Sequence, residues 1–355
     1  MSNYMEYNDK IAFHPGYYIK ELVEESGLTQ EDFAKRLDTT PKNLSLLLRG
    51  EQSLSLDIAM KLSRMLGTSV TYWLNLQNTY DTLVAQFHSD QELVKERKVF
   101  AHLDYRYFRD YYGLPDLPRQ KDEQIKRLRE YMNVSTLLVL TKKDMAVSFR
   151  SEADMTEANV VKANAMVQLA MNEALRMDAP KFNKKKLEEA ARYALTLTRD
   201  HETFYPLVRK ALLEAGVVLV ILPNISGSKI NGATKKIGDN IMLMVNDRRL
   251  YADSFWFTLF HEIGHIINGD FGISFEEEMG NQEDIADRYA EDSLIPPEKY
   301  QEFLARKRFD LPAIRAFANQ IGRDPGIVLG RLQNDEVVRY DDCNMKPLRR
   351  KYKVV

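Results

Sequence analysis

The chain has 355 residues, of which 44% are hydrophobic and 29% charged, with a net charge of -2. This composition excludes a globally disordered chain and a chain that is attracted to nucleic acid as a whole. The single cysteine, Cys343, excludes an internal disulfide, and the first residues, MSNYMEYNDK, contain no hydrophobic signal segment. We therefore expect a cytoplasmic protein of two or three domains that makes no membrane contact.

Residues 15–75 contain a series of short helices separated by tight turns. Thr29 predicts the start of the helix in LTQEDFAKRL. In PKNLSLLLRG, Thr40 caps the next helix, Pro41 takes its first position and Gly50 ends it. A further helix is predicted in LSLDIAMKLSRMLG. Helix, tight turn and helix is the pattern of a helix-turn-helix domain, which we expect to be all-α.

The second helix of a helix-turn-helix lies in the major groove of DNA with its N-terminal residues on the base edges. Asparagine can contact adenine, and lysine can contact guanine or phosphate. The candidate DNA-binding residues are Gln30, Thr40, Lys42, Asn43 and Ser45. Residues 15–75 hold seven Lys and Arg against eight Asp and Glu. We therefore expect weak binding by a monomer, and a homodimer on a palindromic double-stranded operator. A module that binds only proteins, such as a toxin, stays open.

The pattern changes after a helical, aromatic-rich region that ends near residue 180. Three runs of strand type, 217–222, 229–234 and 240–246, precede a helix that begins at about Asp253. The predicted fold class is α+β, mainly α. The predicted domains are an N-terminal helix-turn-helix domain over 1–88, a helical linker region over 89–180, an α+β domain with a small sheet over 181–335, and a basic C-terminal tail over 336–355.

The segment LFHEIGHIINGD places two histidines four residues apart around a glutamate. On a helix, His261 and His265 can present ring nitrogens to one ion, and Glu262 can take a proton from a bound water. This pattern predicts a zinc site that activates a water molecule for hydrolysis. The alternative is a pair of structural histidines whose nitrogens are satisfied by hydrogen bonds in the core.

A zinc hydrolase needs a third protein ligand. Glu283 is our candidate, and Asp287, one turn later, would accept the outer N–H of a ligand histidine. An acidic residue that merely suits a helix start is the alternative for Glu283. The rival ligands are Asp270, Glu276, Glu277 and Glu278. The donor that stabilises the oxyanion is not identified by the sequence, although Arg288 and Tyr289 are near.

Two segments resemble known families. FWFTLFHEIGHIINGD, EDIADRYAEDSLIP and INGAT resemble the ImmA/IrrE zinc metallopeptidases, and HPGYYIKELVEESG with YWLNLQNTYD resembles HigA-type antitoxins of the XRE helix-turn-helix class. The first resemblance implies a zincin-like α+β domain in which His261, His265 and Glu283 bind zinc and Glu262 is the general base. This chain has Ile285 where many members have glutamate.

The sequence therefore predicts a DNA-binding transcriptional regulator with a zinc-dependent endopeptidase domain. The resemblance implies that this domain cleaves a regulatory protein, such as a repressor, or the chain itself in response to a signal. The alternative is a HigA-like antitoxin or transcription factor with a sensory or structural zinc domain, whose partners would include a cognate toxin. The C-terminal KPLRRKYKVV is expected to be a frayed, solvated end.

Overall fold

The computed structural model describes residues 3–142, 156–246, 251–275 and 281–352. These residues form two compact units, one up to Lys95 and one from Glu96 onward. Helix α5 (Val70–Phe100) begins in the first unit and ends in the second. None of the described helices is long and apolar enough to cross a bilayer.

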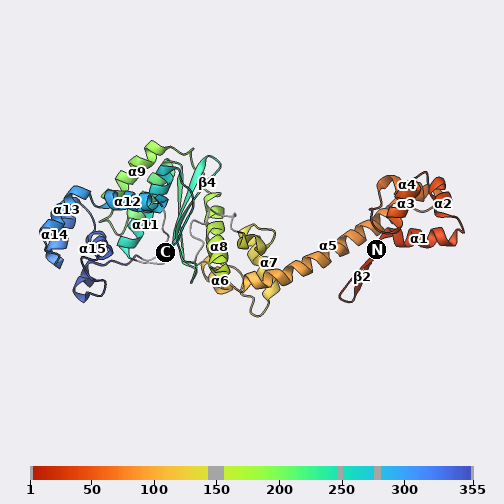
Figure 1. The fold of residues 1–355 in the computed structure, drawn as a ribbon, viewed down its shortest axis with the longest axis horizontal. Helices are drawn as coiled ribbons and strands as arrows, with labels where there is room; N and C mark the ends of the chain where they lie inside the picture. Colours follow the sequence, from red (N-terminus) through yellow and green to blue (C-terminus); the bar gives the residue numbers. More distant parts are fainter. Residues whose placement is uncertain (1–2, 143–155, 247–250, 276–280, 353–355) are drawn as a thin grey trace. The chain divides into compact units, whose positions relative to one another are not determined.

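The N-terminal unit packs short helices around one core (Figure 1). Its elements are β1 (Tyr4–Tyr7), β2 (Lys10–Phe13), α1 (Pro15–Glu25), α2 (Gln30–Arg36), α3 (Pro41–Leu48), α4 (Leu56–Leu66) and the first part of α5. Three of these helices begin at a hydroxyl side chain that accepts a hydrogen bond from the backbone, namely Thr29, Thr40 and Ser55. The turn between α2 and α3 therefore ends at the Thr40 cap.

An antiparallel hairpin, β1 with β2, precedes the first helix. The prediction of an all-α N-terminal domain was therefore wrong. Each strand has four residues, and the ring of Tyr7 lies 5.3 Å from that of Phe87 on α5. A two-stranded hairpin is marginally stable alone, so this packing on a distant helix, which local sequence does not reveal, supports it.

The second unit surrounds a four-stranded sheet with helices (Figure 1). Before the sheet come α6 (Tyr105–Tyr112), α7 (Lys121–Met132), η1 (Leu137–Thr141), α8 (Glu157–Ala174), α9 (Lys184–Thr196) and α10 (Phe204–Glu214). The central part consists of β3 (Val217–Leu222), β4 (Ile230–Ile237), β5 (Asn240–Asn246), α11 (Ala252–Asn268) and β6 (Ile273–Phe275). The last elements are α12 (Asn281–Leu294), α13 (Pro297–Ala305), α14 (Leu311–Ile321), α15 (Pro325–Asn334) and η2 (Cys343–Leu348).

The strands of this sheet lie in the order β3-β5-β4-β6. β3 is parallel to β5, and the other pairs are antiparallel. Helix α8 packs on one face of the sheet and α11 on the other (Figure 1). The sheet therefore lies between two helical layers, and α11 is a buried helix.

The region predicted as a helical linker contributes one of these layers. Val161, Ala165 and Met166 of α8 are fully buried. Beside α8, the buried carboxylate of Glu96 binds the Arg129 guanidinium at 2.6 and 2.7 Å. Packing on the sheet and a buried ion pair join these helices to the second unit. The bounds of the linker region, 89–180, stay a prediction.

The C-terminal residues are held against the start of α11, so the prediction of a frayed end was wrong for the described residues up to 352. Lys351 pairs with Tyr251 in an antiparallel bridge, and the Arg350 carbonyl accepts a hydrogen bond from the Ala252 amide at 2.9 Å. The Tyr352 hydroxyl accepts a hydrogen bond from Trp256 Nε1 at 3.0 Å. These contacts join residues about a hundred positions apart, which charge and composition at the terminus do not indicate.

Candidate metal centre and candidate nucleic-acid interface

The candidate metal centre begins with helix α11, which is buried along most of its length. Trp256 and Phe260 are fully buried, as expected for a helix that is apolar on all sides. His261 and His265 lie one turn apart on the same face, with 8% and 3% of their surfaces exposed. Gly269, with a φ of 75°, ends the helix in the left-handed conformation that glycine adopts without strain.

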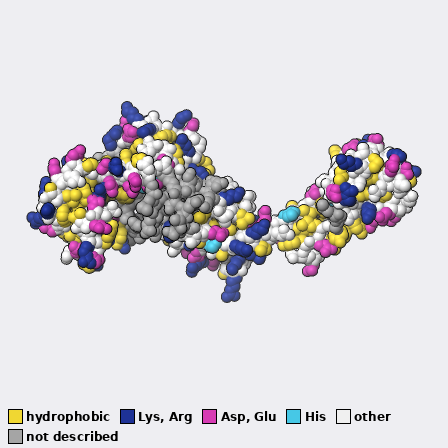
Figure 2. Space-filling view, viewed as in Figure 1, with side chains coloured by type: hydrophobic (Ala, Val, Ile, Leu, Met, Phe, Trp, Pro, Cys, Tyr) yellow, Lys and Arg dark blue, Asp and Glu magenta, His cyan; other side chains and the backbone are white. Residues whose placement is uncertain are grey.

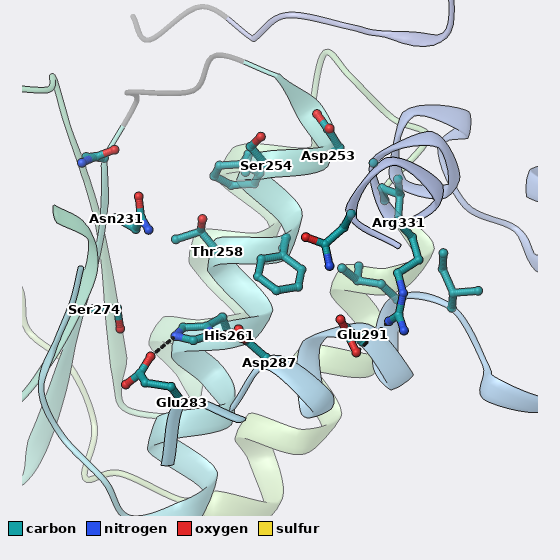
Figure 3. Close-up of a pocket in the computed structure, with 18 of the residues that line it drawn as sticks. Asn231, Asp253, Ser254, Thr258, His261, Ser274, Glu283, Asp287, Glu291 and Arg331 are labelled. Carbon is teal, nitrogen blue, oxygen red and sulfur yellow. Dashed lines mark hydrogen bonds and ion pairs between the residues drawn. The ribbon is translucent and has the colours of Figure 1, made fainter. Parts of the chain in front are cut away.

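Helix α12 brings an acidic side chain to the two histidines. It packs on α11 at Gly264, where a Cβ would lie 3.2 Å from the Ala286 Cα and from the Tyr289 side chain. Because a larger residue would push the helices apart, this glycine keeps them close. Glu283, in the first turn of α12, is 4% exposed and faces His261 (Figure 3).

Three potential ligand atoms converge on one point. The Nε2 atoms of His261 and His265 lie 3.0 Å apart, and the Glu283 carboxylate lies 3.1 Å from the first and 3.4 Å from the second. Two ligands of a tetrahedral zinc ion, at bond lengths of about 2.0–2.1 Å, are roughly 3.3 Å apart. The three groups therefore have the spacing of three corners of a tetrahedron, and these residues fit a zinc ion.

The outer nitrogen of each histidine faces a carboxylate. His261 Nδ1 lies 2.8 Å from Asp287, and His265 Nδ1 lies 3.1 Å from Asp270. Because an ionised carboxylate only accepts hydrogen bonds, each Nδ1 carries the hydrogen. When both rings are neutral, the lone pairs of the two Nε2 atoms face the same point. These lone pairs repel each other unless a cation or a proton lies between them.

In the absence of a metal ion, a proton competes for these lone pairs. Burial disfavours a charged His261, but its hydrogen bonds with Asp287 and Glu283 outweigh burial and raise its pKa to about 10. Burial acts to raise the pKa of Glu283, yet the two histidines outweigh it and hold that pKa well below its usual range. The site therefore favours an ionised carboxylate next to a bound positive charge.

Glu262 lies next to this group in the chain, and its carboxyl points into the interior. It is fully buried, and neither of its oxygens has hydrogen-bond geometry with a described residue, although the Ser274 hydroxyl is near enough to stabilise the charged form. Burial raises its pKa, against the attraction of His261 and His265. A Cβ at Gly232 of β4 would lie 2.3 Å from its Oε1, so only glycine leaves it this space. Such a carboxyl can accept and release a proton.

A cavity of about 370 Å³ opens at the candidate centre (Figure 3). Helices α11 and α12 contribute His261 and Glu283, and the sheet contributes Asn231 and Ser274 from the opposite side. Helix α15 adds Arg331, which is paired with an acidic residue of α12. A chain segment that entered this cavity would meet the candidate ligands on one wall and strand residues on the other.

Other residues considered from the sequence lie elsewhere. Arg288 and Tyr289 line a separate pocket of α12, away from the candidate centre. Asp270, a rival ligand, instead holds the outer nitrogen of His265. The glutamates at 276–278 lie outside the described residues. The positions of Asn231 and Gly232 beside the candidate centre were not predicted, although a glycine inside a strand pattern signals a close approach of the backbone.

The candidate nucleic-acid interface consists of the N-terminal end of α3 and Gln30 at the start of α2. Lys42, Asn43 and Gln30 are exposed. The Thr40 hydroxyl accepts a hydrogen bond from the Asn43 backbone amide at 3.1 Å, so it caps the helix. The exposed lysine and asparagine side chains are therefore free of this cap and project from the first turn.

Ser45, the fifth candidate, is half-buried and already bonded. Its hydroxyl accepts a hydrogen bond from Arg49 at 2.6 Å, and Arg49 also binds Glu51 at 2.9 Å. On the face of this unit drawn in Figure 2, Lys and Arg side chains are interspersed with Asp and Glu. This mixed charge agrees with the acidic balance of the sequence.

Comparisons with known proteins concern this same unit. A family model described as helix-turn-helix matches residues 19–73. An uncharacterized HTH-type transcriptional regulator of Escherichia coli K12, YddM, is 37% identical over 79 residues, which are 22% of this chain and 84% of that protein. Virulence-associated protein I of Dichelobacter nodosus is 31% identical over 80 residues, which are 22% of this chain and 74% of that protein. Through its N-terminal unit, the chain belongs to the helix-turn-helix family of regulators.

Solved structures also resemble this unit. An addiction module antidote protein of a HigA family from Coxiella burnetii is 31% identical, covers 24% of this chain and 94% of its own, and has a TM-score of 0.22. α2 and α3 are consecutive helices joined by a short turn, and in a helix-turn-helix the second helix of the pair lies in the major groove. The first turn of α3 carries Lys42 and Asn43, as the sequence predicted, whereas their contact with DNA stays a prediction.

Proposed function

We propose that this helix-turn-helix regulator binds a double-stranded operator through α3, as a homodimer on a palindrome. The family membership and the exposure of Lys42 and Asn43 at the first turn of α3 support the proposal. The mixed charge of the unit implies weak binding to random DNA, so specificity must come from contacts to bases in two half-sites.

Selection from random duplexes followed by fluorescence anisotropy tests this proposal. Asn43→Ala should relax the preference at one base pair, by about 1–3 kcal/mol. Lys42→Ala should weaken binding to all sequences. It should also lower the slope of the logarithm of the binding constant against the logarithm of the salt concentration by about one. Lys20→Ala, on exposed α1, is the matched control. If no duplex is enriched, operator binding is wrong.

We further propose that the second unit is a zinc-dependent endopeptidase that cleaves a regulatory protein, such as a repressor, or the chain itself. The observation that carries this proposal is the convergence of His261, His265 and Glu283 beside the buried Glu262. The resemblance of the same residues to ImmA/IrrE metallopeptidases supports it. The family match and relatives described above concern the helix-turn-helix unit, so the peptidase assignment rests on these residues.

In this proposal the ligands of zinc would be His261, His265 and Glu283. A zinc ion there would polarise the scissile carbonyl and lower the pKa of water. Asp287 and Asp270 hold the two imidazoles in the tautomer that leaves Nε2 free. Glu262 takes the proton of the attacking water and passes it to the leaving nitrogen, a task that its raised pKa favours.

Metal analysis of the purified protein, together with Glu262→Gln, tests the peptidase proposal. The wild type should contain one zinc ion per chain and cut a repressor encoded by a neighbouring gene, or itself. Glu262→Gln should keep the zinc and lose cleavage by at least about 100-fold. If the wild type binds no zinc, or the variant cleaves as fast as the wild type, the peptidase proposal is wrong.

The second candidate function is a HigA-like antitoxin or transcription factor whose zinc centre only braces or senses. The resemblance of the N-terminal unit to HigA-type regulators favours it. A cognate toxin would then be the protein partner. This candidate predicts zinc that is retained by Glu262→Gln, unchanged operator binding in that variant, and no cleavage of any repressor by the wild type.

A further inference from the structure

Strand β4 contains one extra residue where it faces the candidate centre. On β4, Ile230 and Gly232 pair with consecutive residues of β6, so Asn231 between them has no partner on β6. Such a β-bulge turns a side chain away from the normal alternation. Consistent with this, Gly232 faces Glu262 and its neighbour Asn231 also lines the cavity beside α11.

The bulge is fixed from the neighbouring strand. The side-chain amide of Asn246 on β5 donates a hydrogen bond to the Ile230 carbonyl. Its amide is therefore engaged, although Asn246 also lines the cavity. By contrast, the carboxamide of Asn231 makes no hydrogen bond to the described residues, and it is only half-buried. Asn246 therefore holds the bulge in place, and the carboxamide of Asn231 is available to a ligand.

Figure 3 places Asn231 on the strand side of the cavity, with Ser274 on the same side and His261 across from them. A carboxamide offers one acceptor and two donors, which match the C=O and N–H groups of a peptide main chain. It carries no charge, so it does not select among side chains. This chemistry suits an extended peptide, recognised through its backbone.

We propose that Asn231 binds the main chain of the peptide substrate on the leaving-group side of the scissile bond. This inference rests on the proposed peptidase function. Glu262 delivers its proton to the leaving nitrogen, so that nitrogen must lie near the Glu262 carboxyl. Gly232 contacts this carboxyl, and its neighbour in the bulge, Asn231, lines the cavity across from His261. The first residues after the scissile bond therefore pass Asn231.

Two hydroxamates test the proposal by calorimetry on the zinc-loaded protein. Acetohydroxamic acid carries only the metal-binding group, whereas N-hydroxysuccinamoyl-leucyl-tryptophan methylamide adds main-chain amides on the leaving-group side. Asn231→Ala should weaken the peptidyl hydroxamate about tenfold and change the affinity for acetohydroxamic acid less than about twofold. Asn231→Leu, which keeps the branch at Cγ but cannot form these hydrogen bonds, should behave in the same way. Asn319→Ala, on the exposed face of α14, should change neither affinity.

The acetohydroxamic acid affinity and the zinc content report an intact centre in each variant. If both Asn231 variants bind the peptidyl hydroxamate as tightly as the wild type, Asn231 does not contact the peptide and the inference is wrong. Equal losses for the two probes would also overturn it, because they would place the effect at the metal. A wild type that binds neither zinc nor acetohydroxamic acid contradicts the proposed peptidase function itself.

Discussion

The second unit has two histidine sites in its interior, and they use their ring nitrogens differently. At His201, both nitrogens are occupied: Nε2 lies 3.1 Å from Asp324 and Nδ1 lies 3.3 Å from the Tyr352 hydroxyl. At His261 and His265, a carboxylate holds each Nδ1, and the two Nε2 atoms face each other. Burial alone does not distinguish a ligand histidine from a structural one. The ligand histidine has a free ring nitrogen that points at the same place as other potential ligand atoms.

Removal of one histidine from each site gives the largest expected difference. His261→Ala removes a ligand, and we expect it to weaken zinc binding by more than about 100-fold. His201→Ala should leave zinc affinity within about twofold and lower the melting temperature, because the buried Asp324 carboxylate loses its contact with His201. Zinc titration against a chelator and thermal unfolding measure both effects. Equal zinc affinities in the two variants would contradict the comparison.

The carboxylates that hold the outer nitrogens should differ in importance. Asp270 is 13% exposed at its contact with His265, whereas Asp287 is 49% exposed at its contact with His261. Water can replace a lost bond more easily at the exposed position. We therefore expect Asp270→Asn to weaken zinc binding by about 10- to 100-fold, and Asp287→Asn by less. Asp324→Asn, at the His201 site, is the matched control and should not change zinc affinity.

The pH dependence of zinc binding should also separate the two sites. Asp287 and Glu283 raise the pKa of His261 to about 10, although burial opposes them, so the metal-free protein holds a proton there at neutral pH. Zinc must displace this proton, and its affinity should rise by up to about tenfold per pH unit as the pH increases toward 10. Burial lowers the pKa of His201, which stays neutral and releases no proton.

Calorimetry in two buffers of different ionisation enthalpy counts the protons released on zinc binding. One proton per zinc is expected for the wild type and for His201→Ala. If the observed binding enthalpy is the same in both buffers, no proton is displaced, and the charge distribution described for the metal-free centre is wrong.

Several elements of the second unit could be predicted from the sequence because local pattern determines them. The strands 217–222 and 240–246 have the predicted bounds, since each is a continuous apolar run next to turn residues. Helix α11 ends at Gly269 as predicted. The spacing of His261 and His265 placed them on one face, because helical geometry is local.

The rest depends on contacts between distant residues. β6 has three residues and exists only through its pairing with β4, so no periodicity in its own sequence marks it. The extra residue at Asn231 follows from that same pairing. The sequence makes Asp270 a rival of Glu283 as a ligand because it is acidic and near His265, and only the turn after Gly269 shows that it reaches the outer nitrogen. The spacing of residues in the sequence indicates which residue types can form a centre. The turns of the folded chain determine which of their atoms face it.

The smallest expected effect concerns the bonded site at His201. Tyr352→Phe removes the hydroxyl that joins His201 to Trp256 and keeps the ring, which lies 4.8 Å from that of Phe204. We expect a loss of about 1 kcal/mol in the free energy of unfolding, since two hydrogen bonds are lost but the packing remains. Tyr352→Ala should cost about 2–4 kcal/mol more, because the packing is lost as well. Urea denaturation of the metal-free protein measures both changes. Equal losses in the two variants would show that the C-terminal segment does not pack on α11 in solution. His201 would then lack the Tyr352 hydroxyl as a fixed partner, and the contrast between this site and the metal centre would fail.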